Sequence, residues 1–201
     1  LCNMLYVDQP VGTGFSYSDH ASDYYDQNEQ RMADEVVTLL ETFVRERHPE
    51  LHGRPFYILG ESYAGRYCPR VAHTIVTNAT TRARLNLRAV SMGDAWVSPI
   101  EQYGSFVPFA SQHALLDAEQ RAALQALTDE CVRLLRARDY IEAVAPCNLV
   151  VAGVFAANPG LEQYDIRRRC GDPLQHDCYD FSLAPVFLQQ PAVRAQLRVG
   201  D

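Results

Sequence analysis

Residues 56–69 of the 201-residue chain read FYILGESYAGRYCP, and they carry the strongest structural signal in the sequence. It opens with an apolar run that has the length and composition of a short buried strand. From Ser62 to Thr77 small and apolar residues recur at helical spacing, so a helix is expected there. Only a tight turn fits between the two. The sequence therefore predicts a strand, a sharp turn that carries a hydroxyl group, and a helix.

A strand that runs through Gly-x-Ser into a helix is the nucleophile elbow of the α/β-hydrolases. Such a turn strains the serine backbone and lifts its hydroxyl clear of the sheet, at a helix N-terminus whose dipole favours a developing oxyanion. The small neighbours that the turn needs are Gly60, Ala64 and Gly65, with Ala64 in place of the second motif glycine. The alternative is an ordinary serine N-cap. The elbow explains both flanking elements, so Ser62 is the candidate nucleophile.

The first half of the chain repeats this alternation of strand and helix. The runs NMLYVD (residues 3–8) and LRAVSMGD (residues 87–94) predict two further strands, and apolar spacing predicts a helix over residues 28–48 that Pro49 ends. Alternating strands and helices are typical of an α/β protein with a parallel sheet. The expected fold class is an α/β-hydrolase fold, with a partial parallel core sheet over residues 1–96.

After residue 96 the alternation gives way to helices and loops. Asp117 is a candidate N-cap for a long helix, and an irregular region containing cysteine and proline follows it as far as about residue 185. We interpret residues 97–184 as a helical, cysteine-containing cap inserted over the sheet. Residues 185–201 are expected to be one helix that returns to the core, with Pro191 in its first turn.

The composition excludes several classes of function. The net charge of −7 argues against a nucleic-acid partner, which would require a basic face. All 18 basic residues are arginines, so the chain has no Walker phosphate loop, Schiff-base lysine or Ser–Lys dyad. No apolar run approaches the ~20 residues that span a bilayer, and no membrane partner is expected.

The cysteines stand at positions 2, 68, 131, 147, 170 and 178, and none forms the CxxC pair of a zinc or thioredoxin-like site. No metal site is expected. We predict that Cys170 pairs with Cys178 and that Cys131 pairs with Cys147. Four cysteines allow three connectivities, and their spacing alone does not decide among them.

The other two cysteines, Cys2 and Cys68, are expected to be unpaired. Asn78-Ala79-Thr80 is a glycosylation sequon, which makes Asn78 a candidate glycosylation site. Disulfides and N-linked glycans both belong to proteins of oxidising compartments. These features together favour such a compartment.

Several segments resemble the serine carboxypeptidases, the group of carboxypeptidase Y and cathepsin A. The most specific are GESYAGRYCP and, upstream of it, VDQPVGTGFSYSD. GDAWVSP, QYDIRRRC with CYD, and FLQQPAVRAQLRVG resemble later segments of the family. The resemblance runs through most of the chain and is weakest over residues 115–160. The sequence departs at Cys68, where the family usually carries valine or isoleucine, and at GDAW, which replaces a more common Gly-Asn-Gly.

The resemblance implies a serine-type carboxypeptidase, a hydrolase that removes C-terminal residues from peptides through an acyl-enzyme, at acidic pH. Ser62 would be the nucleophile, and the backbone N–H of Tyr63 would donate to the oxyanion. Glu61, kept protonated, would bind the terminal carboxylate of the substrate. No cofactor is implied, the partners would be peptide or protein C-termini, and the location would be lysosomal, vacuolar or secreted. Homodimerisation is left open.

The chain offers no evident base for Ser62. His73 lies 11 residues further along the same helix, ~16 Å along its axis. His113 and His176 fall in or near the insertion, whereas the acid and the histidine of α/β-hydrolases follow later strands. We therefore expect an internal fragment of a longer protein, inactive alone, that lacks the N-terminal oxyanion segment and the C-terminal aspartate and histidine.

Two alternative functions stay open. Some relatives are acyltransferases that act on small molecules, and those usually carry aspartate at the position of Glu61. A non-catalytic homologue would act instead as a protective scaffold for a partner enzyme. Glu61 and the intact elbow favour the peptidase over both.

Overall fold

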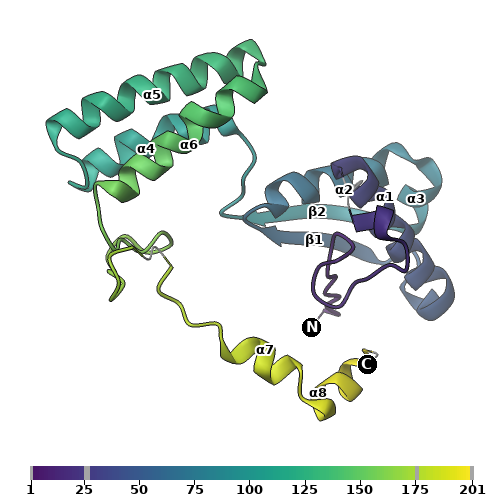
Figure 1. The fold of residues 1–201 in the computed structure, drawn as a ribbon. Helices are drawn as coiled ribbons and strands as arrows, with labels where there is room; N and C mark the ends of the chain where they lie inside the picture. The colour runs from purple at the N-terminus through teal and green to yellow at the C-terminus, as the bar shows by residue number, and fades with distance from the viewer. Residues whose placement is uncertain (1, 25–27, 175–176, 200–201) are drawn as a thin grey trace. The chain divides into compact units, whose positions relative to one another are not determined.

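The computed structural model describes residues 2–24, 28–174 and 177–199 (Figure 1). The chain forms two compact units, Leu1–Val97 and Ser98–Asp201. The first contains a small parallel sheet with helices, and the second is built from helices and loops. In the described ranges, no helix combines the length and the apolar character that crossing a bilayer requires.

The sheet of the first unit has two described strands, which pair in parallel: β1 (Pro55–Glu61) and β2 (Asn86–Gly93). Parallel strands need a crossover connection, and here it consists of α2 (Ala64–Thr77) followed by the short α3 (Ala79–Arg84). The strand and helix predicted around Ser62 and the strand predicted over residues 87–94 are therefore confirmed. Both strands end at the same edge of the sheet, and this edge carries the elbow.

One face of the sheet bears the core of the unit. α2 lies against both strands, and α1 (Glu29–Thr42) packs alongside α2 (Figure 1). Phe56 and Ile58 of β1 join the buried side chains of α1 and α2 in one apolar cluster. Because side chains alternate along a strand, Tyr57 and Leu59 point to the other face, where they are exposed.

The helix predicted over residues 28–48 is present in two parts. Asn28 caps α1 by accepting hydrogen bonds from two backbone N–H groups of its first turn. The helix continues as the π-helical turn η2 (Phe43–Arg47), and the 3-10 turn η3 (Pro49–Leu51) follows. The proline that begins η3 ends the helical run, as predicted.

The strand predicted over residues 3–8 is wrong. Residues 2–9 carry no strand, and Tyr6 is 85% exposed. An apolar run becomes a strand only where a neighbour supplies its backbone hydrogen bonds. Among the described residues, β1 pairs with β2 and with no third strand.

The loop that follows residue 8 folds on itself. The carboxylate of Asp8 accepts a hydrogen bond from the N–H of Phe15 (2.9 Å), and the Ser16 hydroxyl donates to the Asp8 carbonyl (2.6 Å). The loop ends in the 3-10 turn η1 (Ala21–Tyr24), whose Tyr24 hydroxyl donates to the carbonyl of Ser18 (2.9 Å). These contacts make it a self-contained structural loop.

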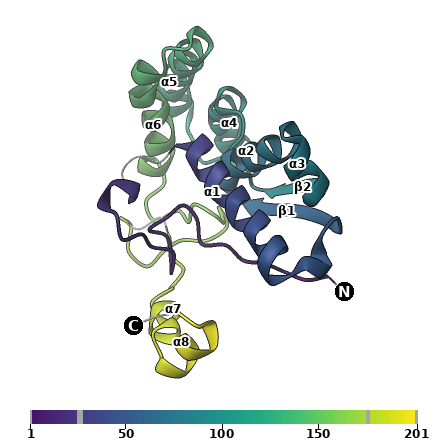
Figure 2. The ribbon, with the colours of Figure 1, turned by 90° about the vertical axis from the view of Figure 1, so that its right-hand side faces the viewer.

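The second unit contains three helices that pack side by side: α4 (Pro99–Gln112), α5 (Ala118–Ala137) and α6 (Tyr140–Ala156) (Figure 2). Asp117 caps α5 in a capping box with Gln120, so the predicted N-cap is confirmed. The predicted disulfide between Cys131 and Cys147 is present and joins α5 to α6.

The irregular region predicted after α5 is wrong in its first part, because α6 occupies it. The helix continues through Pro146, which has no N–H to donate to the ladder. Apolar residues lie all around α6: Ala143, Val150 and Val154 are buried, whereas Ile141 is 81% exposed. A helix that is apolar on every side shows no stripe at a 3.6-residue period, so its sequence resembled a loop interrupted by proline.

The single helix predicted over residues 185–201 is also wrong. The structure has two short helices, α7 (Leu183–Leu188) and α8 (Pro191–Leu197), and Pro191 stands at the first turn of the second, as predicted. Gln190 between them is extended, with ψ 132°, because a residue that precedes proline avoids the helical region. Residues 200 and 201 lie outside the described ranges.

Candidate active site

Ser62 stands at the tip of the turn between β1 and α2, in a conformation that few serines adopt. Its φ is +57°, in the left-handed region that costs a residue with a side chain free energy. The backbone around it compensates: its N–H donates to the carbonyl of Gly93 (3.0 Å), and its carbonyl accepts from the N–H groups of Gly65 (3.0 Å) and Trp96 (2.9 Å). Ser62 itself is exposed. This is the geometry of a nucleophile elbow.

Gly60 allows α2 to lie close to the end of β1. A Cβ at this position would fall 2.5 Å from the Cβ of Ala64 and 2.5 Å from the sulfur of Cys68. Cys68 is a buried, unpaired cysteine, and burial raises the pKa of its thiol. The side chains at 64 and 68 therefore fill the space that a larger residue 60 would need.

Gly65 allows a second close approach, between the first turn of α2 and the main chain of Trp96. A Cβ at Gly65 would lie 2.6 Å from the nitrogen, 2.8 Å from the oxygen and 2.9 Å from the carbonyl carbon of Trp96. The segment after β2 thus presses on the first turn of α2 and also hydrogen-bonds Ser62.

The backbone N–H of Tyr63 is available for an oxyanion. Within the described part of the chain it donates no hydrogen bond, since it precedes the first turn of α2. The Tyr63 ring meets Tyr67 edge-on, with 5.1 Å between ring centroids, and the Arg66 guanidinium lies 5.6 Å from the centroid of the Tyr63 ring. Arg66 also forms an ion pair with Glu29 of α1. These contacts tie the elbow to the neighbouring helix.

Glu61 is the last residue of β1, directly before Ser62, and it is exposed. Its register partner on β2 is Gly93, and a Cβ at Gly93 would be in ordinary van der Waals contact with the Glu61 Cγ, at 3.8 Å. The carboxyl group therefore sits at the same edge of the sheet as the Ser62 hydroxyl.

No hydrogen bond in the described ranges joins the Ser62 hydroxyl to a histidine. His48 bonds to Glu50 (2.9 Å between Nδ1 and Oε1). His113 belongs to the second unit, where its ring lies 4.5 Å from that of Phe109, and His176 lies outside the described ranges. The Ser62 hydroxyl and the Tyr63 N–H thus lie at one turn, and among the described residues no histidine is hydrogen-bonded to that hydroxyl.

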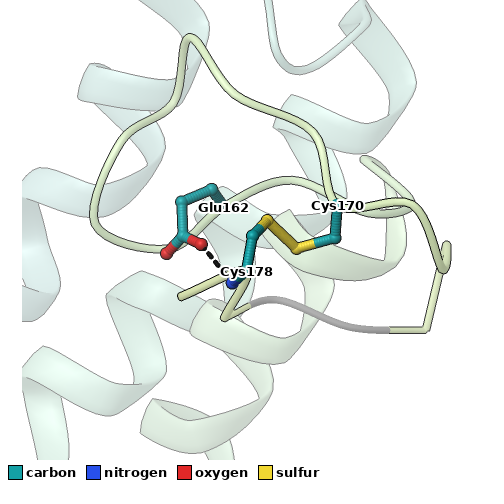
Figure 3. A group of neighbouring side chains, drawn as sticks. All are labelled: Glu162, Cys170 and Cys178. Carbon is teal, nitrogen blue, oxygen red and sulfur yellow. Dashed lines mark hydrogen bonds between the residues drawn. A yellow bond between two sulfur atoms is a disulfide. The ribbon is translucent and has the colours of Figure 1, made fainter. Parts of the chain in front are cut away.

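A second group of chemically interesting side chains lies in the second unit, where Glu162 adjoins Cys170 and Cys178 (Figure 3). Their sulfur and carboxylate atoms lie within 4.8 Å of one another. The two sulfurs form the predicted disulfide, and the carboxylate accepts hydrogen bonds from the N–H of Tyr164 (3.0 Å) and of Cys178. The sulfur atoms are thus held in a disulfide and the carboxylate oxygens in hydrogen bonds, and together they fix the conformation of this loop.

Asn78, the sequon residue, is exposed between α2 and α3. Its Oδ1 accepts hydrogen bonds from the N–H of Thr80 (3.0 Å) and of Thr81 (3.1 Å), and so caps α3. The amide nitrogen that would carry a glycan is not used by this cap.

Trp96 has a role at this turn that the sequence did not predict. Its backbone N–H and its close approach to Gly65 were not foreseeable from GESYAG. A signal was present nonetheless: GDAW follows a predicted strand, and the ends of neighbouring parallel strands meet at one edge of a sheet.

Comparisons with known proteins find relatives that match almost the whole chain. The family model for serine carboxypeptidase matches residues 1–201. Serine carboxypeptidase-like 49 of Arabidopsis thaliana is 35% identical over 99% of this chain and 39% of its own length. The human "Probable serine carboxypeptidase CPVL" is 32% identical over 99% of this chain and 42% of its own length. The chain thus spans about two fifths of the length of these relatives.

Among solved structures, the chain is similar to KEX1(delta)p, a prohormone-processing carboxypeptidase from Saccharomyces cerevisiae. The TM-score is 0.79 at 23% sequence identity, and the match covers 96% of this chain and 45% of that one. This likeness concerns the fold, which is that of the α/β-hydrolases. With the family model matching throughout its length, the chain belongs to the serine carboxypeptidase family.

Proposed function

We propose that this chain provides the nucleophile of a serine-type carboxypeptidase. The observation that carries the proposal is the elbow itself: Ser62 at φ +57°, exposed, beside a Tyr63 N–H that donates to no described acceptor. The Ser62 Oγ would attack the last peptide carbonyl of the substrate and form an acyl-enzyme with release of the C-terminal residue, and water would then hydrolyse the ester. The Tyr63 N–H would donate to the oxyanion of each tetrahedral intermediate.

Glu61 is the proposed reader of the substrate's terminal carboxylate. Two carboxylates repel each other, so the Glu61 carboxyl group must be protonated to donate a hydrogen bond to the substrate. Acidic pH would favour that form. Its position next to Ser62 at the sheet edge supports the role.

The general base and its acid are proposed to come from outside these 201 residues, as is the second oxyanion donor. The absence of a histidine hydrogen bond to Ser62 in the described ranges supports this. In this proposal residues 1–96 are the partial hydrolase core, residues 97–184 its cap, and residues 185–201 the return to the core. The chain alone would be inactive.

We infer an oxidising, acidic location, lysosomal, vacuolar or secreted, for the complete protein. The two disulfides and the exposed sequon residue Asn78 support it. Peptide or protein C-termini are the proposed substrates.

Kinetics of the complete protein would test the proposal. A blocked dipeptide and a phenolic glucose ester separate peptidase from acyltransferase activity, and inactivity towards both would indicate a scaffold. Ser62→Ala should lower kcat for the dipeptide by about 10⁶-fold. Ser105→Ala, which removes an exposed helical hydroxyl, is the matched control and should leave kcat unchanged. Dipeptide turnover that survives Ser62→Ala would refute the assignment.

A further inference from the structure

The left-handed conformation of Ser62 is bracketed by one short segment, Gly93–Trp96, which we call the clip. The Ser62 N–H donates to the carbonyl at the start of the clip (3.0 Å), and the N–H at its end donates to the Ser62 carbonyl (2.9 Å). Both backbone polar groups of the serine are thus bonded to residues only three positions apart. The clip fixes the peptide planes on either side of the residue that carries the hydroxyl.

To make both bonds, the clip must turn sharply after β2, and Asp94 is where it turns. Asp94 has φ +43°, in the left-handed region. Among residues with a side chain, asparagine and aspartate enter this region most readily, and a β-branched residue is a genuine outlier there. The backbone of Asp94 therefore matters to the position of Trp96 and, through it, to Ser62.

The carboxylate of Asp94 has no role in holding the clip. In the described part of the chain it makes no hydrogen bond or ion pair, and the residue is exposed. The end of the clip is located by close packing instead, because the main chain of Trp96 leaves no room for a Cβ at Gly65. A small change in the backbone at Asp94 would thus shift the main chain of Trp96 and, with it, the hydrogen bond to Ser62 at the elbow.

We propose that Asp94 is a positioning residue, whose left-handed backbone closes the clip and so orients the Ser62 hydroxyl. The inference rests on the proposed function, since it assumes that Ser62 is the nucleophile. The competing role is a direct one, in which the Asp94 carboxylate contacts the substrate. The two roles depend on different properties of residue 94. The positioning role requires the left-handed backbone, whereas direct contact with the substrate requires the negative charge.

Substitutions at position 94 of the complete enzyme separate these roles. Asp94→Asn and Asp94→Gly keep the left-handed conformation and remove the charge, so both should retain kcat and KM within about 3-fold. Asp94→Val should lower kcat by about 10²-fold with little change in KM, as expected for a misplaced nucleophile. The rate at which a fluorophosphonate labels Ser62 should fall in parallel.

A matched control keeps the test independent of stability. Ala114 is also left-handed, with φ +54°, and lies in the second unit, so Ala114→Val introduces the same backbone strain away from the elbow. It should leave the labelling rate of the folded protein unchanged. Where Asp94→Val fails to fold, Asp94→Ala replaces it, with an expected loss of about 5-fold in the labelling rate.

The outcomes distinguish a failure of the proposed function from a failure of the positioning role alone. Failure of the reagent to label the wild-type enzyme at Ser62 would overturn the proposed function and the positioning role with it. A labelled wild type with equal labelling of Asp94→Val, or of Asp94→Ala where that replaces it, would overturn the positioning role alone. If Asp94→Asn and Asp94→Gly both weaken substrate binding, raising KM at least about 10-fold, Asp94 is assigned to substrate binding instead.

Discussion

At the scale of single residues, Glu162 is a charged group held almost entirely by main-chain atoms. It is completely buried, and burying a charge is costly unless hydrogen bonds replace the lost water. Hydrogen bonds from the N–H groups of Cys178 and Tyr164 do so, and they lower the pKa of the Glu162 carboxyl from its ordinary value of 4.5. The ionised form is therefore the one that the fold stabilises.

This makes the contribution of Glu162 to stability dependent on pH. A lowered folded-state pKa gives stability that is complete above the unfolded value of 4.5 and is lost as the pH falls through the folded value. Glu162→Gln should thus lower the melting temperature most near neutral pH, and the gap from the wild type should narrow below pH ~4.5. Glu142→Gln, at an exposed helical glutamate, is the control. A gap for Glu162→Gln that stays constant from pH 7 to pH 3 would contradict the prediction.

The sequence was sufficient to predict the elbow but insufficient to predict what holds it. GESYAG places the strand end, the turn and the helix start within a few residues, so local chemistry determines them. The bonds from Gly93 and Trp96 to Ser62 depend on how β2 is aligned with β1, and that alignment is a tertiary property. Both predicted disulfides are present, although the spacing of the cysteines alone did not decide the pairing.

At the scale of elements, two of the errors share a physical origin in missing context. The apolar run at residues 3–8 has the composition of a strand but no partner among the described strands. α6 has too many apolar residues to show a stripe, and its burial is set by α4 and α5. Elements with their own caps, such as α1 with Asn28 and α5 with Asp117, were predicted correctly because their signals are local.

Asn78 has two roles, as the N-cap of α3 and as the sequon residue, and substitutions can separate them. Asn78→Ala removes both the cap of α3 and the sequon, and loss of such a cap typically costs about 1 kcal/mol. Thr80→Ala removes the sequon but keeps the Thr80 N–H that donates to Asn78 (3.0 Å). In a secretory host we expect both variants to lose a glycosidase-sensitive mass, and only Asn78→Ala to lose further stability after deglycosylation. Equal melting temperatures of the two deglycosylated variants would contradict the capping role.

At the scale of the whole molecule, helices of the first unit cover one face of its sheet and leave apolar side chains exposed on the other. Tyr57 (55% exposed) and Leu59 (64% exposed) lie on the other face of β1. Each described strand also has one edge without a described neighbour. Exposed apolar faces and open edges promote association between copies.

We therefore expect the 201-residue chain, prepared alone, to be catalytically inactive and poorly soluble. It should bind a dye specific for apolar surfaces, and the double substitution Tyr57→Thr with Leu59→Thr should reduce that binding and raise solubility. Ile58→Thr is the matched control, because Ile58 faces the core and its loss should increase dye binding. A soluble chain whose dye binding is unaffected by the double substitution would contradict this view of the sheet face.

The contact between Gly65 and Trp96 also limits which mutational routes evolution can follow. An alanine at Gly65 would meet main-chain atoms of residue 96, which are the same whatever side chain residue 96 carries. A change of side chain at residue 96 therefore does not remove this contact. Gly153 on α6 offers the opposite case, since a Cβ there would meet the side chain of Leu124. A suppressor screen should thus recover smaller residues at 124 for Gly153→Ala, and no second-site revertant at 96 for Gly65→Ala.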